Sequence, residues 1–189
     1  GDPLPDSVDW ELWSGPAPKP IYKEGYFHPG SWRYWMDYGC GRFGDFACHT
    51  NNAMYKVLQP GYPTSVEVIT QSQFNGDSFP AQRVLKWKFP KRGDRAAFEA
   101  FWYDGGLKPP RPKQLEGSRE LWKNGSLFIG TKGTMYVVGS HNSSAILIPE
   151  SERKAFGKPE LLVPVGREHH MDFVDAAKGL LPWDATLSN

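Results

Sequence analysis

A series of short apolar and β-branched runs between residues 64 and 149 constrains the fold more than any other feature of the chain. "TSVEVITQ" (64–71) is rich in β-branched residues, which favour strands. "VLKWKF" (84–89) alternates apolar residues with lysine, which is typical of a strand with one face in water. Together with "FEAFWY" (98–103), these runs predict three consecutive strands.

Two further runs continue this pattern. "SLFIGTKGTMYVVG" (126–139) consists of two apolar segments around Gly-Thr-Lys-Gly, which predicts a hairpin, and "SAILIP" (144–149) predicts another strand. Helical patterns occur at about 45–58 and at 169–180. Because short turns join neighbouring strands in antiparallel order, we expect an α+β fold: an open, mainly antiparallel β-sheet with a few helices on one face.

The segments outside these elements are rich in proline and glycine. Residues 1–35 contain six prolines, which break helices, so we expect an extended arm rich in proline and tryptophan. Residues 104–125 form a long Pro/Gly-rich loop, and such loops inside compact domains are often functional. The chain has no internal repeat, and we treat residues 1–189 as a single domain.

The charge balance excludes several classes of partner. Lys and Arg number 22 and Asp and Glu 21, so the net charge of +1 creates no strong field to attract nucleic acid or an acidic membrane. No apolar run approaches the roughly 18 residues that span a bilayer. Aromatic residues make up 14% of the chain, and such residues fill cores and line sugar sites.

The glycines and cysteines near residue 40 exclude two kinds of site. "GCGRFG" (39–44) has dinucleotide-motif spacing, but no buried strand precedes it, so we reject dinucleotide binding by this segment. Cys40 and Cys48 lack the spacing of a zinc site, and we predict no metal site. We expect Cys48 to be a buried free thiol. This cysteine usage favours a reducing, cytoplasmic compartment over the periplasm.

Asp45 and His49 lie four residues apart, directly after Gly39, Gly41 and Gly44. In a helix this spacing puts both side chains on one face. Asp45 would lie in the first turn, where the helix dipole favours a carboxylate, and would orient His49 as a general base. The glycines would let a ligand approach the backbone. The other interpretation, which spacing alone favours, is a capping aspartate bonded to a core histidine.

Four other histidines and a tyrosine are weaker candidates. Tyr103 ends a predicted strand at the long loop, where it would hold a sugar or pack at the sheet edge. His169 and His170 open the last predicted helix, and two adjacent histidines point to different faces. His28, which precedes a proline, is interpreted as a surface loop residue, and His141 receives no role.

Five separated blocks, in this order along the chain, resemble the C-terminal domain of bacterial Gfo/Idh/MocA-type oxidoreductases. They span almost the whole chain. The blocks are "LPDSVDWELWSGPAPKPIY", "HPGSWRYWMDYGCGRFGDFACH", "FWYDGGLKPPRP", "NGSLFIGTKGTMYV" and "HHMDFVDAAKG".

The resemblance implies a two-domain enzyme. An N-terminal Rossmann domain binds NAD or NADP, and a C-terminal open antiparallel sheet supplies substrate contacts and the oligomer interface. The family's catalytic lysine lies in a Glu-Lys-Pro motif of the Rossmann half, which is missing here. We therefore expect a truncated fragment that binds no cofactor, does not turn over alone and forms a homo-oligomer through its sheet.

The resemblance also assigns roles to residues near the glycines. Gly41, Gly44, Asp45 and His49 match the family's Gly-rich motif. In relatives this histidine acts as acid and base on the sugar hydroxyl that loses its hydride, and the aspartate hydrogen-bonds substrate. Ala47 departs from the pattern, because relatives often have glycine there.

Further substrate contacts are expected from Trp32, Arg33 and Tyr103, and from His169 and Asp172, which match an H-x-x-D pattern of the closest branch. The function implied is the substrate domain of an NAD(P)-dependent sugar or polyol dehydrogenase that acts on a small carbohydrate. Two alternatives stay open. One is an NAD-dependent glycosidase that works by transient oxidation and elimination, and the other is a non-enzymatic carbohydrate-binding or scaffold domain.

Overall fold

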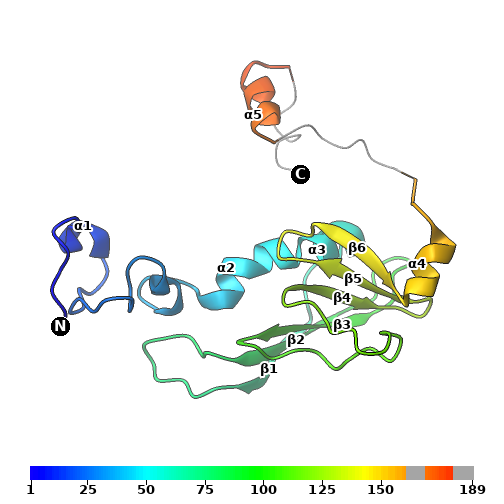
Figure 1. Cartoon of the computed structure of the whole chain (residues 1–189), viewed down its shortest axis with the longest axis horizontal. Coiled ribbons are helices and arrows are strands. Elements are labelled where there is room, and N and C mark those ends of the chain that lie inside the picture. Colours follow the sequence, from blue (N-terminus) through cyan, green and yellow to red (C-terminus); the bar gives the residue numbers. More distant parts are fainter. Residues whose placement is uncertain (161–168, 181–189) are drawn as a thin grey trace. The chain divides into compact units, whose positions relative to one another are not determined.

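The computed structural model describes residues 1–160 and 169–180 of the chain. The chain divides into two compact units, Gly1–Arg153 and Lys154–Asn189, and each is described by itself. Figure 1 shows the order of the elements along the chain. None of the helices in the part described has the length and hydropathy needed to cross a bilayer.

Six strands form two antiparallel sheets in the first unit (Figure 1). The first sheet has the order β1-β2-β3, and the second has the order β4-β5-β6. The α+β class and the antiparallel pairing are therefore confirmed, and the sheet is divided in two. The strands are β1 (Ser65–Gln71), β2 (Arg83–Phe89), β3 (Phe98–Asp104), β4 (Gly125–Ile129), β5 (Thr134–Val138) and β6 (Ser144–Ile148).

The alternation predicted for β2 is observed in only part of the strand, because Val84 is buried as well as Leu85. In β2, Leu85 and Phe89 are buried and Lys88 is exposed, as expected for a strand with one wet face. The β4–β5 hairpin pairs Ile129 with Thr134, and the Gly130 N–H donates to the carbonyl of Gly133 across the predicted turn. The sequence therefore predicted these strands to within about one residue at each end.

Five α-helices and one 3-10 helix accompany the strands in the described residues. The predicted helix at 45–58 was wrong in its bounds, because the segment forms two helices that meet at Asn51. Helix α4 was not predicted. The helices are α1 (Trp10–Ser14), the 3-10 helix Ser31–Tyr34, α2 (Gly41–Thr50), α3 (Asn52–Leu58), α4 (Glu150–Phe156) and α5 (His169–Ala177).

Helix α2 contacts both sheets. Phe43 stacks on Trp87 of β2, with ring centroids 5.2 Å apart, and meets Trp102 of β3 edge-on at 5.3 Å. At the other end of the helix, the Ser126 hydroxyl of β4 donates to the Thr50 carbonyl at 2.9 Å. The helix that carries the predicted site is therefore held at both ends by strands.

The N-terminal arm was expected to be extended and without a helix, and that expectation was wrong. Helix α1 forms there with Asp9 as its N-cap, because the Asp9 carboxylate accepts from the Leu12 N–H at 3.0 Å. Trp10, Tyr22 and Phe27 are buried together in a small aromatic core. The arm thus buries apolar surface of its own despite its prolines.

Candidate functional site

The start of helix α2 depends on two glycines. Gly41 has φ +69°, and a Cβ atom there would lie 2.7 Å from Cγ of Phe79. A side chain at Gly44 would clash with Cys40, which precedes the helix. Both glycines therefore permit close approach by the protein's own side chains, whereas the sequence suggested approach by a ligand.

Asp45 pairs with Arg33 rather than with His49. Arg33 Nε lies 3.1 Å from Asp45 Oδ2, and both side chains are half-exposed. The Arg33 guanidinium also lies over the ring of Trp32, 4.6 Å from the ring centre, and donates to the Gly30 carbonyl at 3.2 Å. Of the predicted substrate contacts, Trp32 and Arg33 are thus brought together with Asp45.

Asp45 lies in the second turn of α2, because the helix starts four residues earlier than expected. The predicted stabilisation by the helix dipole therefore does not apply, since that effect is confined to the first turn. The helix start at Gly41 was missed because glycine is a poor helix former and usually lies beyond helix ends. The positive charge that faces Asp45 comes from Arg33 instead.

His49 lies one helical turn after Asp45 and is exposed. Its ring meets Phe46 edge-on, with centroids 6.3 Å apart, and meets His141 at 5.1 Å with an angle of 64° between the planes. In the part of the chain described, no hydrogen bond joins Asp45 to His49. The core histidine that spacing alone favoured is thus not observed: His49 faces solvent, where a substrate can reach it.

His141 is the residue that sequence reasoning missed. It lies in the turn between β5 and β6, and the next residue, Asn142, donates from Nδ2 to the His49 carbonyl at 2.8 Å. Asn142 and His49 are 93 positions apart in the sequence. A histidine in a Gly/Ser/Asn turn was visible in the sequence, but no local pattern links it to α2.

Of the other predicted contacts, Tyr103 lies apart from this group. Tyr103 of β3 stacks on Phe101, and because side chains alternate along a strand, it lies on the opposite sheet face from Trp102, which contacts α2. Burial raises the pKa of the Tyr103 hydroxyl. His169 and Asp172 belong to α5 in the second unit, where Asp172 is buried. The side chain of His169 lies outside the described structure.

Both cysteines are free and exposed, so the prediction of a buried Cys48 was wrong. Helix α2 packs on the first sheet through Phe43, and Cys48 lies away from that narrow face, with its thiol directed to the Asp45 carbonyl at 3.7 Å. Within residues 1–160 and 169–180, no group of three or more His, Cys, Asp or Glu side chains is placed to hold a metal ion.

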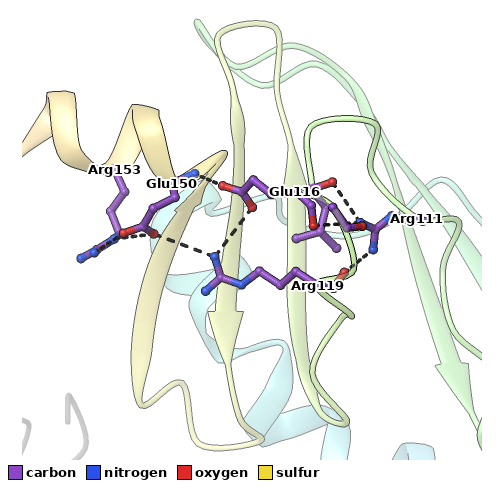
Figure 2. Close-up of polar contacts among 7 residues, drawn as sticks. Arg111, Glu116, Arg119, Glu150 and Arg153 are labelled. Carbon is purple, nitrogen blue, oxygen red and sulfur yellow. Dashed lines mark hydrogen bonds and ion pairs between the residues drawn. The ribbon is translucent and has the colours of Figure 1, made fainter.

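A second polar cluster organises the long Pro/Gly-rich loop (Figure 2). The Arg111 guanidinium donates to four carbonyls of that loop, those of Leu115, Glu116, Gly117 and Arg119. The Glu116 carboxylate accepts from the backbone N–H of Glu150, at the start of α4. These contacts tie the loop to α4 and explain its order without a ligand.

A shallow cleft of about 440 Å³ lies beside this cluster. Its two arginines are not free, because Arg119 lies 3.9 Å and Arg153 lies closer still to the Glu150 carboxylate. The cleft therefore holds little net charge, and nothing in it matches the predicted site residues. It is lined by Arg119, Ser144, Ala145, Ile146, Glu150 and Arg153.

Comparison with known families identifies the class of protein. Residues 1–94 match a family model described as "Oxidoreductase family, C-terminal alpha/beta domain". The chain belongs to the Gfo/Idh/MocA oxidoreductases, and it carries their C-terminal domain. Comparison with curated proteins found no match.

The match covers only some of the predicted site. It includes Trp32, Arg33, Asp45 and His49, and it ends between β2 and β3. The resemblance of the later blocks, and with it the roles of Tyr103 and of α5, stays a prediction. These four residues are therefore the best-supported part of the predicted site.

Proposed function

We propose that this chain is the substrate-binding domain of an NAD(P)-dependent sugar or polyol dehydrogenase. One observation carries the proposal: on a helix inside the family match, an arginine-paired carboxylate and an exposed imidazole lie one turn apart, at Asp45 and His49. A carboxylate held by arginine accepts hydrogen bonds from sugar hydroxyls. An exposed imidazole is a suitable proton acceptor near neutral pH.

The residues have separate roles in this proposal. His49 takes the proton from the hydroxyl group that is oxidised. Asp45 accepts a hydrogen bond from a neighbouring hydroxyl, and Arg33 holds the carboxylate in place through their ion pair. The Trp32 ring, already covered on one side by Arg33, offers an apolar surface to a sugar ring.

The cofactor would be bound outside this chain. The described residues form two antiparallel sheets and contain no parallel sheet of the kind that holds a dinucleotide. They do not fit NAD or NADP by themselves, so we assign cofactor binding to a Rossmann domain of the full-length protein. The chain alone is expected to be inactive.

The test is His49→Ala in the full-length enzyme. A positioned general base contributes about 10²–10⁴-fold to rate, so kcat should fall by that order. Thermal stability should hardly change, because His49 is exposed. Cys48→Ala is the matched control, since it is an exposed neighbour on the same helix without a proposed role.

Two results would overturn the proposal. A His49→Ala enzyme with full turnover would remove His49 from the chemistry. Release of a free sugar with no net change in cofactor would be the second, because it indicates the glycosidase. A dehydrogenase instead accumulates reduced cofactor with each sugar oxidised.

A further inference from the structure

The second sheet holds the end of the helix that carries His49. The turn between β5 and β6 places Asn142 against α2, where its Nδ2 donates to the His49 carbonyl at 2.8 Å. Ser126 of β4 donates to the next carbonyl, that of Thr50, at 2.9 Å. The last carbonyls of a helix have no partner within the helix, so these bonds fix its C-terminal turn.

The same turn places the His141 ring against the His49 ring. The ring centroids are 5.1 Å apart and the planes meet at 64°, which is an edge-to-face contact. Phe46 approaches the His49 ring at 6.3 Å with an angle of 66°. His49 thus has an aromatic neighbour on α2 and another from the second sheet, and together they restrict its side-chain rotamers.

The geometry of the turn suits an asparagine. Asn142 has φ +55°, a left-handed conformation that asparagine adopts more readily than most residues other than glycine. Its Oδ1 atom is buried and has no hydrogen-bond partner among the described residues. Glycine would adopt this φ without strain, but it has no side chain to donate to the His49 carbonyl. Asparagine at this position therefore combines the required backbone conformation with the amide that fixes the turn against α2.

We propose that His141 is a positioning residue for His49. The β5–β6 turn sets its ring, and the ring contact holds the His49 imidazole in the orientation in which it takes the substrate proton. This inference rests on the proposed role of His49. It adds a residue that lies outside the family match, which ends at residue 94.

The kinetic test compares His141→Ala with His141→Phe in the full-length enzyme. Misplacement of a reacting group lowers rate steeply, so His141→Ala should lower kcat by about 10- to 100-fold. The KM for the sugar should change less than about twofold, because Asp45, Arg33 and Trp32 are untouched. His141→Phe keeps an aromatic ring at the position and should recover most of kcat.

A second readout does not depend on activity. In the same protein labelled at histidine, removal of the His141 ring should shift the NMR signals of the His49 ring protons, because an aromatic ring 5.1 Å away changes their magnetic environment. His28→Ala is the control, since the His28 ring contacts Trp13 in the N-terminal arm and not α2. It should leave the His49 signals in place.

The outcomes separate this inference from the proposed function. If His49→Ala keeps full turnover, the proposed function and the positioning role of His141 are both refuted. If His49→Ala is slow but His141→Ala keeps its kcat, only the positioning role is refuted. A His141→Phe enzyme as slow as His141→Ala would show that a ring nitrogen is needed and would overturn positioning by ring contact. Unmoved His49 signals in His141→Ala would do the same.

Discussion

Among single residues, Asp45 has two possible roles: it can bind the substrate, or it can stabilise the fold through its ion pair with Arg33. Its two side chains are 42% and 33% exposed, and such pairs stabilise a fold by at most about 1 kcal/mol. A hydrogen bond from a substrate hydroxyl to a charged carboxylate is worth about 1.5–3 kcal/mol. Asp45 should therefore matter more for substrate affinity than for stability.

We expect Asp45→Asn to raise the KM for the sugar by about 10- to 100-fold, the range that this hydrogen bond corresponds to. Its melting temperature should stay close to that of the wild type. Steady-state kinetics and thermal unfolding of the same preparation provide the measurement. Asp37→Asn, a change at an exposed neighbour, is the control. A destabilised Asp45→Asn enzyme with unchanged KM would contradict the binding role.

Glu116 gives a prediction on pH. Hydrogen bonding from the Glu150 N–H, followed by bonding to its own backbone and attraction to Arg119, lowers the pKa of this carboxyl below its ordinary value. A carboxyl whose pKa is lower in the folded state stabilises the fold above its ordinary pKa of about 4.3, and that contribution is lost as pH falls through the lower folded value.

Glu116→Gln should therefore lower the melting temperature at neutral pH, and its difference from the wild type should shrink as pH falls below about 4.3. Thermal unfolding between neutral and acidic pH measures this difference. Glu120→Gln is the control, because that side chain is 85% exposed and its ion pair with Lys108 spans 4.0 Å. A difference that stayed constant down to the lowest pH would rule out the ionised contact.

At the scale of elements, the start of α2 determines where the site residues point. Gly41 opens the helix with a left-handed φ and lies against Phe79.

Gly41→Ala should destabilise the protein by roughly 1–3 kcal/mol, because it adds backbone strain and a steric clash. Denaturant unfolding measures the change. Gly133→Ala is the matched control, since Gly133 has an ordinary φ and open space around it. Equal stability of the two variants would show that Gly41 can be replaced.

Elements with a local pattern were predictable from the sequence, and those fixed by distant contacts were not. All six strands were found because β-branched and alternating runs carry their own signal. Helix α4 (ESERKAF) was missed because it is short and has only two apolar residues, so it carries no helical apolar periodicity, and its contact with Glu116 joins residues 34 positions apart. The contact of α2 with Asn142 spans 93 positions, so the spacing of Asp45 and His49 identified their shared face but not their partners.

At the scale of the whole molecule, the first sheet has exposed apolar residues that suggest self-association. Val66 and Val68 of β1 are each more than half exposed, and they share one sheet face because they pair with Trp87 and Leu85 of β2. Among the described residues, β1 is also an edge strand of this sheet. We propose that the chain forms a homo-oligomer through this sheet at its β1 edge, since an exposed apolar edge strand tends to pair with another chain.

Val66→Glu tests this assembly on the exposed edge strand. Val66 is 61% exposed, so the fold should tolerate a carboxylate at this position. In an interface, however, two copies would each bury a charge without a partner, which is strongly unfavourable. We expect light scattering to show an oligomer for the wild type and a monomer for Val66→Glu.

The control is Ile129→Glu, which changes an apolar residue that is 70% exposed on the second sheet and should leave the oligomer intact. A wild type that stays monomeric at high concentration, or an Ile129→Glu variant that dissociates in place of Val66→Glu, would exclude the first sheet as the interface.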